Sequence, residues 1–258
     1  LIREVQDRHP DVIFLAEAFT RPKLMRRLAK VGFTQSYTYF TWRTGKQELA
    51  DYLREVLQGE AADYMRPHFF VNTPDINPPY LHGGDPAMFK LRAALAATSS
   101  GLWGLYSGFE LCEGTPVAGK EEYQDSEKYQ LRAWDWDRPG NIRGFIAALN
   151  RIRQQNPALR RMGGFTLRSA WHDQVLCYEK ATDSGDNVVL VALNLEPARA
   201  AHAVSLELPL EAWGLPDDGA VGVKDLLTGA QWHWYGRWQQ VTLDHGDPVR
   251  IWRLRVPR

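Results

Sequence analysis

The stretch Val12-Ile13-Phe14-Leu15-Ala16-Glu17 places a carboxylate directly after an uninterrupted apolar run. The same order recurs in Phe69-Phe70-Val71-Asn72-Thr73-Pro74-Asp75, where an acid follows a second apolar run after a short turn. Strands of a parallel sheet are buried on both faces, so they read as continuous apolar runs. In (β/α) barrels, catalytic side chains lie where such strands end. The sequence therefore predicts Glu17 and Asp75 on one face of a barrel, and paired carboxylates there suit glycosidic-bond chemistry.

Apolar runs alternate with helical patterns through the first part of the chain. The predicted strands are residues 12–16, 35–40, 68–72 and 102–106. Apolar residues at helical spacing follow each of them, and Pro22 and the pair Asp85-Pro86 mark helix starts. The last of these helices is expected to stop before Pro157. Consecutive β–α units predict an α/β fold in which residues 1–162 are the second half of a (β/α)8 barrel, with the first half upstream of Leu1.

Beyond residue 163 the pattern changes to short segments rich in β-branched and aromatic residues, which predict strands over residues 175–179, 188–194, 203–208, 221–226, 231–238, 240–243 and 249–254. Turn sequences such as Asp183-Ser184-Gly185-Asp186 and Pro216-Asp217-Asp218-Gly219 separate these segments. The pattern predicts an antiparallel β-sandwich as a C-terminal domain over residues 163–258. No group of catalytic residue types occurs in it, so we expect a structural cap on the barrel.

Composition excludes several classes of partner. The 258 residues include 31 basic and 31 acidic side chains, and this balance argues against nucleic acid. The longest apolar run, residues 188–193, is too short to cross a membrane. Cys112 and Cys177 lack metal-ligand spacing, so we expect a cytoplasmic protein with no metal and no cofactor. The ten Trp residues suit core packing in a β domain or stacking on sugar rings.

A half barrel with Glu after its first strand, Asp after its third and a C-terminal β-sandwich resembles the alpha-amylase superfamily of retaining enzymes. Longer strings resemble one of its families, the maltosyltransferases that use maltose 1-phosphate. The strings are FLAEAFTRPK (14–23), FTQSYTYFTWR (33–43), FVNTPDI (70–76), YSGFELCE (106–113) and DSEKYQ (125–130). The likeness starts at the fifth strand of the family's barrel and covers nearly the whole chain.

The resemblance implies a double displacement that retains the anomeric configuration. Glu17 would be the acid/base, and Asp75 would bind sugar hydroxyls and stabilise the cationic transition state. Lys128 and Tyr129 would bind the phosphate or sugar of the donor. The implied reaction moves maltosyl units from alpha-maltose 1-phosphate to the non-reducing end of an alpha-1,4-glucan acceptor and releases inorganic phosphate, in an enzyme that is a homodimer at full length. The nucleophile would be an Asp upstream of Leu1, so these residues alone are expected to be inactive.

One departure from ordinary amylases separates the candidate functions. Amylases usually carry Asn-His-Asp after the seventh strand, whereas this chain has Asn72-Thr73-Pro74-Asp75 with no His beside the acid. This difference favours the maltosyltransferase over a plain hydrolase. The alternatives are another glucan hydrolase or transglycosylase of the superfamily, and a non-catalytic glucan-binding protein.

Overall fold

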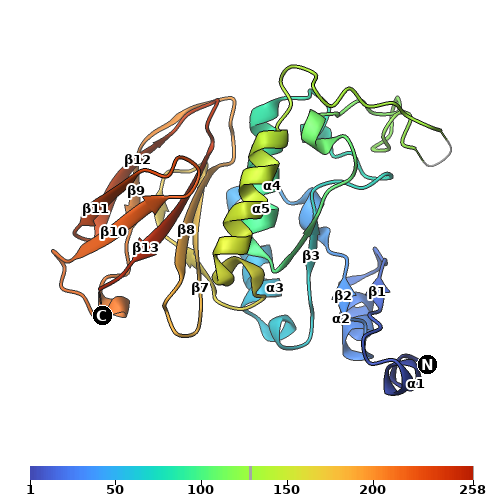
Figure 1. Cartoon of the computed structure of the whole chain (residues 1–258), viewed down its shortest axis with the longest axis horizontal. Coiled ribbons are helices and arrows are strands. Elements are labelled where there is room, and N and C mark those ends of the chain that lie inside the picture. Colours follow the sequence, from blue (N-terminus) through green and yellow to red (C-terminus); the bar gives the residue numbers. More distant parts are fainter. Residues whose placement is uncertain (128–129, 258) are drawn as a thin grey trace.

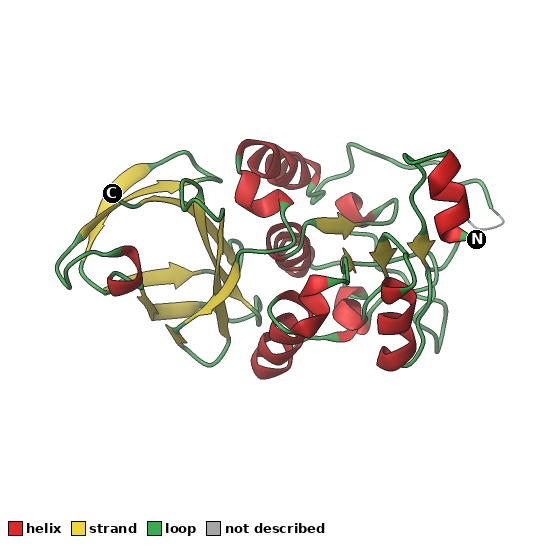
Figure 2. Cartoon of the chain, turned by 90° about the horizontal axis from the view of Figure 1, so that it is seen from below, coloured by secondary structure: helices red, strands yellow, loops and turns green. Residues whose placement is uncertain are grey.

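The computed structural model describes residues 1–127 and 130–257. Helices and short parallel strands occupy the N-terminal part, and antiparallel strands occupy the part from residue 165 onward. Figure 1 shows the two termini at opposite ends of the molecule, and Figure 2 shows helices flanking the short parallel strands.

The parallel strands lie in the order β1, β2, β3, β4, which are Leu15–Ala16, Gln35–Ser36, His68–Phe70 and Leu102–Gly104. β1 pairs with β2 and β3 with β4, both in parallel. A parallel bridge between Ser36 and Pro67 joins the two pairs. All of these strands therefore point their carboxyl ends to the same edge. That they form half of an eight-stranded barrel stays a prediction.

The strands are shorter than predicted. Residues 12–14 are not assigned to a strand, although they lead into β1. The predicted strand over residues 35–40 ends at Ser36, because Tyr39–Trp42 form the 3₁₀ helix η1, in which the hydroxyl of Thr38 accepts from Phe40 N at 3.4 Å. This turn therefore contains Tyr39 and Phe40, which were predicted to lie in the strand, and also Trp42.

The predicted helix signals are confirmed. The α-helices are α1 (Ile2–Arg8), α2 (Pro22–Lys30), α3 (Lys46–Leu57), α4 (Pro86–Ser99) and α5 (Arg143–Gln155). Pro22 opens α2, and the Asp85 carboxylate caps α4 by accepting from Ala87 N at 3.0 Å. α5 ends one residue before Asn156-Pro157. Short 3₁₀ helices are η2 (Glu60–Asp63), η3 (Pro79–Leu81), η4 (Phe109–Leu111), η5 (Pro157–Arg160) and η6 (Glu211–Trp213).

The C-terminal part is built from antiparallel strands. They are β5 (Phe165–Arg168), β6 (Ala170–Trp171), β7 (Val175–Ala181), β8 (Val188–Asn194), β9 (Ala201–Glu207), β10 (Ala220–Asp225), β11 (Gln231–Tyr235), β12 (Trp238–Leu243) and β13 (Val249–Arg255). One sheet has the order β11-β10-β13-β8-β7-β5, and a smaller sheet has the order β12-β9-β6. Both inner faces contribute to a shared apolar core, as expected of an antiparallel β domain.

The larger sheet is covered on both faces. One face packs on the smaller sheet, and the other packs on α3, α4 and α5 in a single apolar cluster. The Tyr178 hydroxyl of β7 is hydrogen-bonded to the Thr98 hydroxyl of α4 at 2.5 Å. Every residue of β8 is buried, which explains why its sequence is apolar without alternation.

Lys180 occupies the junction between these two parts. Its side chain is fully buried and donates to the carbonyls of Arg161 (2.8 Å), Met162 (3.4 Å) and Gly163 (2.7 Å). Burial, followed by the positive charges of Arg153 and Arg161, lowers the pKa of Lys180 to about 7. The three carbonyls offset part of the cost of burying this ammonium group.

Stability is expected to rise with pH between about 7 and 9. In that window the folded chain holds fewer protons on Lys180 than the unfolded chain, whose Lys pKa is about 10.4, so the free energy of unfolding increases by up to about 1.4 kcal/mol per pH unit. Urea denaturation at several pH values should show this slope, and Lys180→Met should flatten it. An unchanged slope in that variant would contradict the assignment.

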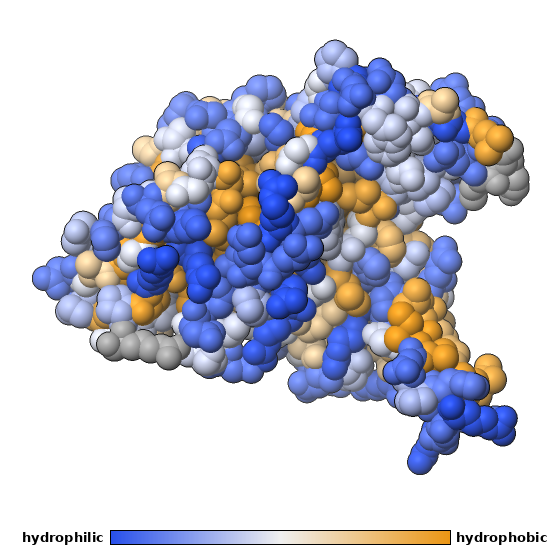
Figure 3. Space-filling model, viewed as in Figure 1, coloured by the Kyte–Doolittle hydropathy of each residue, from blue (hydrophilic) through white to orange (hydrophobic). Residues whose placement is uncertain are grey.

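Apolar side chains are exposed at the end of the molecule that carries β1. Ile13 is 63% exposed and Leu15 is 57% exposed, and Val12, Phe19 and Leu24 are exposed nearby. Figure 3 shows apolar surface at this end, around the position of α1 and α2 in Figure 1. A contiguous apolar patch beside the free edge of β1 is typical of a surface that another chain segment covers.

We expect this chain on its own to self-associate through that patch. Light scattering after gel filtration should give a mass above that of a monomer, and Ile13→Lys combined with Leu15→Lys should reduce it. Leu131→Lys is the matched control, because Leu131 is also fully exposed but lies in the segment before α5. A monomeric wild-type chain would show that the exposed patch does not drive association.

Candidate active site

Glu17 directly follows β1 and is exposed to solvent. The backbone N–H of Tyr37, just past β2, donates to Ala16 O at 3.1 Å, which brings the two strand ends together. Burial, and then the negative charge of Glu17, raise the pKa of the Tyr37 hydroxyl. That hydroxyl stays protonated at neutral pH, so it can donate a hydrogen bond beside the Glu17 carboxylate.

A row of aromatic rings crosses the ends of β1, β2 and β3. Phe19 lies 5.4 Å from Trp42 and 5.3 Å from Tyr37, measured between ring centroids. Tyr37 lies 4.8 Å from Phe70, and Phe70 stacks on His68 at 4.0 Å. Burial lowers the pKa of His68 and keeps this ring neutral at physiological pH. The row offers aromatic faces of the kind that pack on the apolar faces of sugar rings.

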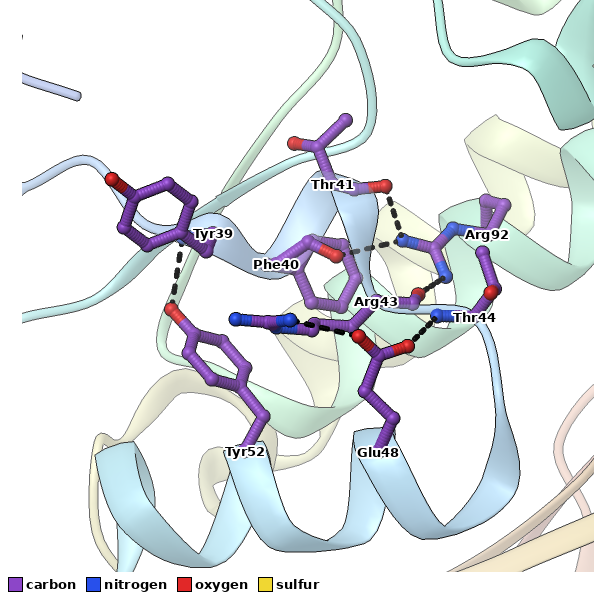
Figure 4. A network of polar contacts seen from close by, with 8 residues as sticks. All are labelled: Tyr39, Phe40, Thr41, Arg43, Thr44, Glu48, Tyr52 and Arg92. Carbon is purple, nitrogen blue, oxygen red and sulfur yellow. Dashed lines mark hydrogen bonds and ion pairs between the residues drawn. The ribbon is translucent and has the colours of Figure 1, made fainter.

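A buried arginine fixes the turn that supplies Trp42. Arg92 of α4 is only 2% exposed and donates to the carbonyls of Arg43 (2.8 Å), Phe40 (3.0 Å) and Thr41 (3.3 Å), as Figure 4 shows. Its guanidinium also lies 4.7 Å from the ring centroids of Phe40 and Tyr80. The turn η1 is therefore held by a side chain from a helix well removed in sequence.

A second layer of contacts supports the same turn from α3. Glu48 accepts from the Arg43 side chain at 2.7 Å and from Thr44 N at 3.0 Å. Tyr39 N donates to the Tyr52 hydroxyl at 2.9 Å. Both ends of η1 are thus held by side chains of α3. The Trp42 Nε1–H donates to Glu121 Oε2 at 2.9 Å.

Asp75 lies in the loop that follows β3. Thr73 and Ile76 exchange backbone hydrogen bonds of 3.0 and 3.1 Å, so Asp75 is exposed near the tip of a tight turn. Asn72 comes just before this turn and is fully buried. Its side chain accepts from Tyr106 N at 2.8 Å and donates to the Tyr123 hydroxyl at 2.8 Å. Asn72 therefore positions the loops after β3 and β4 together, a role that the sequence reading did not assign.

Residues 113–127 and 130–138 lie between η4 and α5 in the chain. Glu113 is buried and paired with Arg132 at 2.7 Å. Burial alone would raise the pKa of Glu113, but hydrogen bonds from Thr115 and the charges of Arg132 and Arg138 hold it below its ordinary value. The Tyr106 hydroxyl donates to Ser126 O. The predicted ligands Lys128 and Tyr129 lie outside the described residues.

The two predicted carboxylates lie in the loops that follow β1 and β3, and aromatic rings run from Phe19, near Glu17 in the chain, to Phe70 at the end of β3. Among residues 1–127 and 130–257, no three His, Cys, Asp or Glu side chains are grouped so as to hold a metal ion. No helix in the same ranges is long and apolar enough to cross a membrane.

The described side chains offer carboxylates, hydroxyls and aromatic faces, which suit acid–base chemistry on a sugar.

Comparison with known proteins decides the family. The alpha-1,4-glucan:maltose-1-phosphate maltosyltransferase of Cereibacter sphaeroides is 54% identical over 258 residues, which is 100% of this chain and 38% of that protein. The Pseudomonas aeruginosa maltosyltransferase is 55% identical over 256 residues, covering 99% of this chain and 38% of that protein. The chain belongs to the maltosyltransferase family. It spans less than half the length of these curated relatives.

Two further comparisons agree with this family. Residues 167–254 match the family model described as "GLGE, C-terminal". An alpha-amylase from Anoxybacillus superposes with a TM-score of 0.75 at 15% identity, over 100% of this chain and 55% of the amylase. A maltogenic alpha-amylase from Thermotoga neapolitana gives 0.69 at 13% identity, over 99% of this chain and 57% of the amylase. These structures show that this chain has an alpha-amylase-like fold.

Proposed function

We propose that this chain is part of a retaining maltosyltransferase, which moves maltosyl units from alpha-maltose 1-phosphate to the non-reducing end of alpha-1,4-glucans and releases phosphate. The observation that carries the proposal is the identity of 54% to a maltosyltransferase along the whole chain. The position of Glu17 at a strand end beside an aromatic row supports it. Residues 1–162 would be the second half of the catalytic barrel, and residues 163–258 would be its β-sandwich cap.

Glu17 acts as the general acid/base in this proposal. It gives its proton to the leaving phosphate oxygen, and its carboxylate then removes the proton of the acceptor hydroxyl. The carboxylate nucleophile of the double displacement belongs, by the family resemblance, to the barrel strand that precedes the matched region. Asp75 binds sugar hydroxyls and stabilises the positive charge that develops on the sugar ring.

The neighbouring side chains position the donor. The aromatic row from Trp42 to Phe70 would pack on the two glucose rings, since it runs from the loop that carries Glu17 to the end of β3. Lys128 and Tyr129 would bind the phosphate, because an ammonium and a phenol both donate to phosphate oxygens. The free, buried thiols of Cys112 and Cys177 support a cytoplasmic location, and the resemblance supports a homodimer at full length.

Phosphate dependence tests the proposal. A chimera is made in which this chain replaces the matching region of the Cereibacter sphaeroides relative. We expect the chimera to release phosphate from maltose 1-phosphate when glycogen is added, and to form maltose 1-phosphate from glycogen and phosphate in reverse. Hydrolysis of glycogen with no dependence on phosphate would instead favour a hydrolase of the same fold.

A further inference from the structure

Two tryptophan side chains form an exposed pair on the outer face of the smaller sheet. Trp171 of β6 is 71% exposed and Trp238 of β12 is 43% exposed. Their ring centroids are 5.1 Å apart and the ring planes meet at 67°. Aromatic side chains of this size are usually covered in a folded domain, so two of them in contact and open to solvent call for a ligand.

Sheet register places polar groups between the two rings. Ser205 of β9 is paired with Trp171 on one side and with Gln240 on the other. The Gln240 amide donates to the Ser205 hydroxyl, and Glu207 is paired with Trp238. Val204 and Leu206 alternate with these residues and point into the core. The outer face is therefore a mixture of aromatic faces and polar hydrogen-bonding groups, of which only the Glu207 carboxylate is charged among Ser205, Glu207 and Gln240, unlike a purely apolar protein-binding patch.

A groove of about 810 Å³ continues from Trp171. Its charged residues are Lys46, Asp173, Glu196 and Arg199, so its formal charges cancel. Lys46 of α3 donates to the carbonyls of Ala170 (3.0 Å) and His172 (2.8 Å), on either side of Trp171. The segment that presents the exposed ring is thus held in place before any ligand binds.

The chemistry of this surface fits a neutral, polyhydroxylated chain. Sugar C–H groups carry partial positive charge and pack on the negative faces of indole rings, while hydroxyls exchange hydrogen bonds with amides, hydroxyls and carboxylates. The cancelled charges of the groove favour an uncharged ligand over a phosphate or a nucleic acid. Because the two ring planes are inclined to each other, they suit successive units of a curved alpha-1,4-linked chain better than the units of a flat, sheet-forming glucan.

We propose that Trp171, Trp238 and the adjoining groove form a non-catalytic binding site for alpha-glucan chains, separate from the ends of the parallel strands. The inference rests on the proposed function for the identity of the polymer. Such a site would hold the acceptor polymer on the enzyme between transfers and raise its effective concentration.

Binding of maltoheptaose tests the site without any turnover. Calorimetry on the full chain should detect binding of maltoheptaose but no binding of cellohexaose. Trp171→Ala should weaken maltoheptaose binding roughly tenfold, which corresponds to a loss of about 1.4 kcal/mol. Trp232→Ala is the matched control, because Trp232 is 36% exposed on the other sheet and should leave the affinity unchanged. Absence of maltoheptaose binding, or equal affinity in Trp171→Ala, would overturn the proposal.

A second arm separates this site from catalysis and from a protein partner. In the chimera, Trp171→Ala should raise the KM for glycogen at unchanged kcat, and leave the KM for maltohexaose unchanged. If the chimera transfers no maltosyl groups, the proposed function fails while maltoheptaose binding still decides the site. If Trp171→Ala converts an oligomeric chain to a monomer at unchanged sugar affinity, the pair is an interface between copies and the glucan site is wrong.

Discussion

Replacing Glu17 with Gln should lower maltosyl transfer from maltose 1-phosphate by about 10²–10⁴-fold in the chimera, the usual cost of losing one positioned proton donor. Glutamine keeps the shape of the side chain but cannot protonate the leaving phosphate or activate the acceptor hydroxyl. Phosphate release in the presence of glycogen measures the effect.

A donor that departs without a proton isolates the role of Glu17. With maltosyl fluoride, Glu17→Gln should form the covalent intermediate more readily than with maltose 1-phosphate and then stall, because the acceptor hydroxyl still needs a base. Mass spectrometry should detect the intermediate. Glu4→Gln is the control, since Glu4 is an exposed carboxylate in α1. Near-wild-type turnover in Glu17→Gln would refute the role.

Replacing Arg92 with Met should destabilise the chain by about 3–5 kcal/mol. The substitution leaves the carbonyls of Phe40, Thr41 and Arg43 buried without their donor, and each unsatisfied group costs about 1–3 kcal/mol. Urea denaturation of the wild type and the variant measures the difference. Arg92→Lys should be intermediate, because an ammonium cannot reach three carbonyls as a planar guanidinium does.

Arg26→Met is the matched control for Arg92. Arg26 forms its ion pair with Glu55 on the surface of α2, where such pairs contribute about 0–1 kcal/mol. If both substitutions cost the same, the carbonyl network of Arg92 contributes nothing specific. Where Arg92→Met still folds, the chimera should bind donor more weakly, because η1 no longer holds Trp42 beside Phe19.

Local signals in the sequence predicted the helices well. Proline at the start of α2, the Asp85 cap of α4 and Pro157 after α5 act within a few residues, so they can be read without tertiary information. The short strands β5 and β6 were missed because they have only four and two residues, too few for a clear pattern, and are held by pairing with β7 and β9. The predicted strand over residues 231–238 is two strands, and Trp238 opens the second after the turn at Gly236.

The site was predictable only in outline. Glu17 and Asp75 follow apolar runs, and the run before each acid contains β1 or β3. Their catalytic roles stay a prediction. Arg92 lies in a helix that was predicted from its Asp85-Pro86 start and from apolar residues at helical spacing. Its three carbonyl partners are in η1 and just after it. Nothing near Arg92 in sequence indicates those partners, and the same holds for Asn72 and Tyr123.

Helices pack on one face of β7 and β8, and the smaller sheet packs on the other. This packing has a consequence for the design of chimeras between these enzymes. Because one apolar cluster includes Leu49 of α3, Leu95 of α4 and Val191 of β8, the β domain is not an exchangeable module. Grafting residues 163–258 onto a distant relative would set unmatched side chains against α3 and α4, and cores tolerate such volume changes poorly. Crossover points that keep the shared packing intact fall before Phe40, the first residue of that cluster, so that helices and sheet are inherited together.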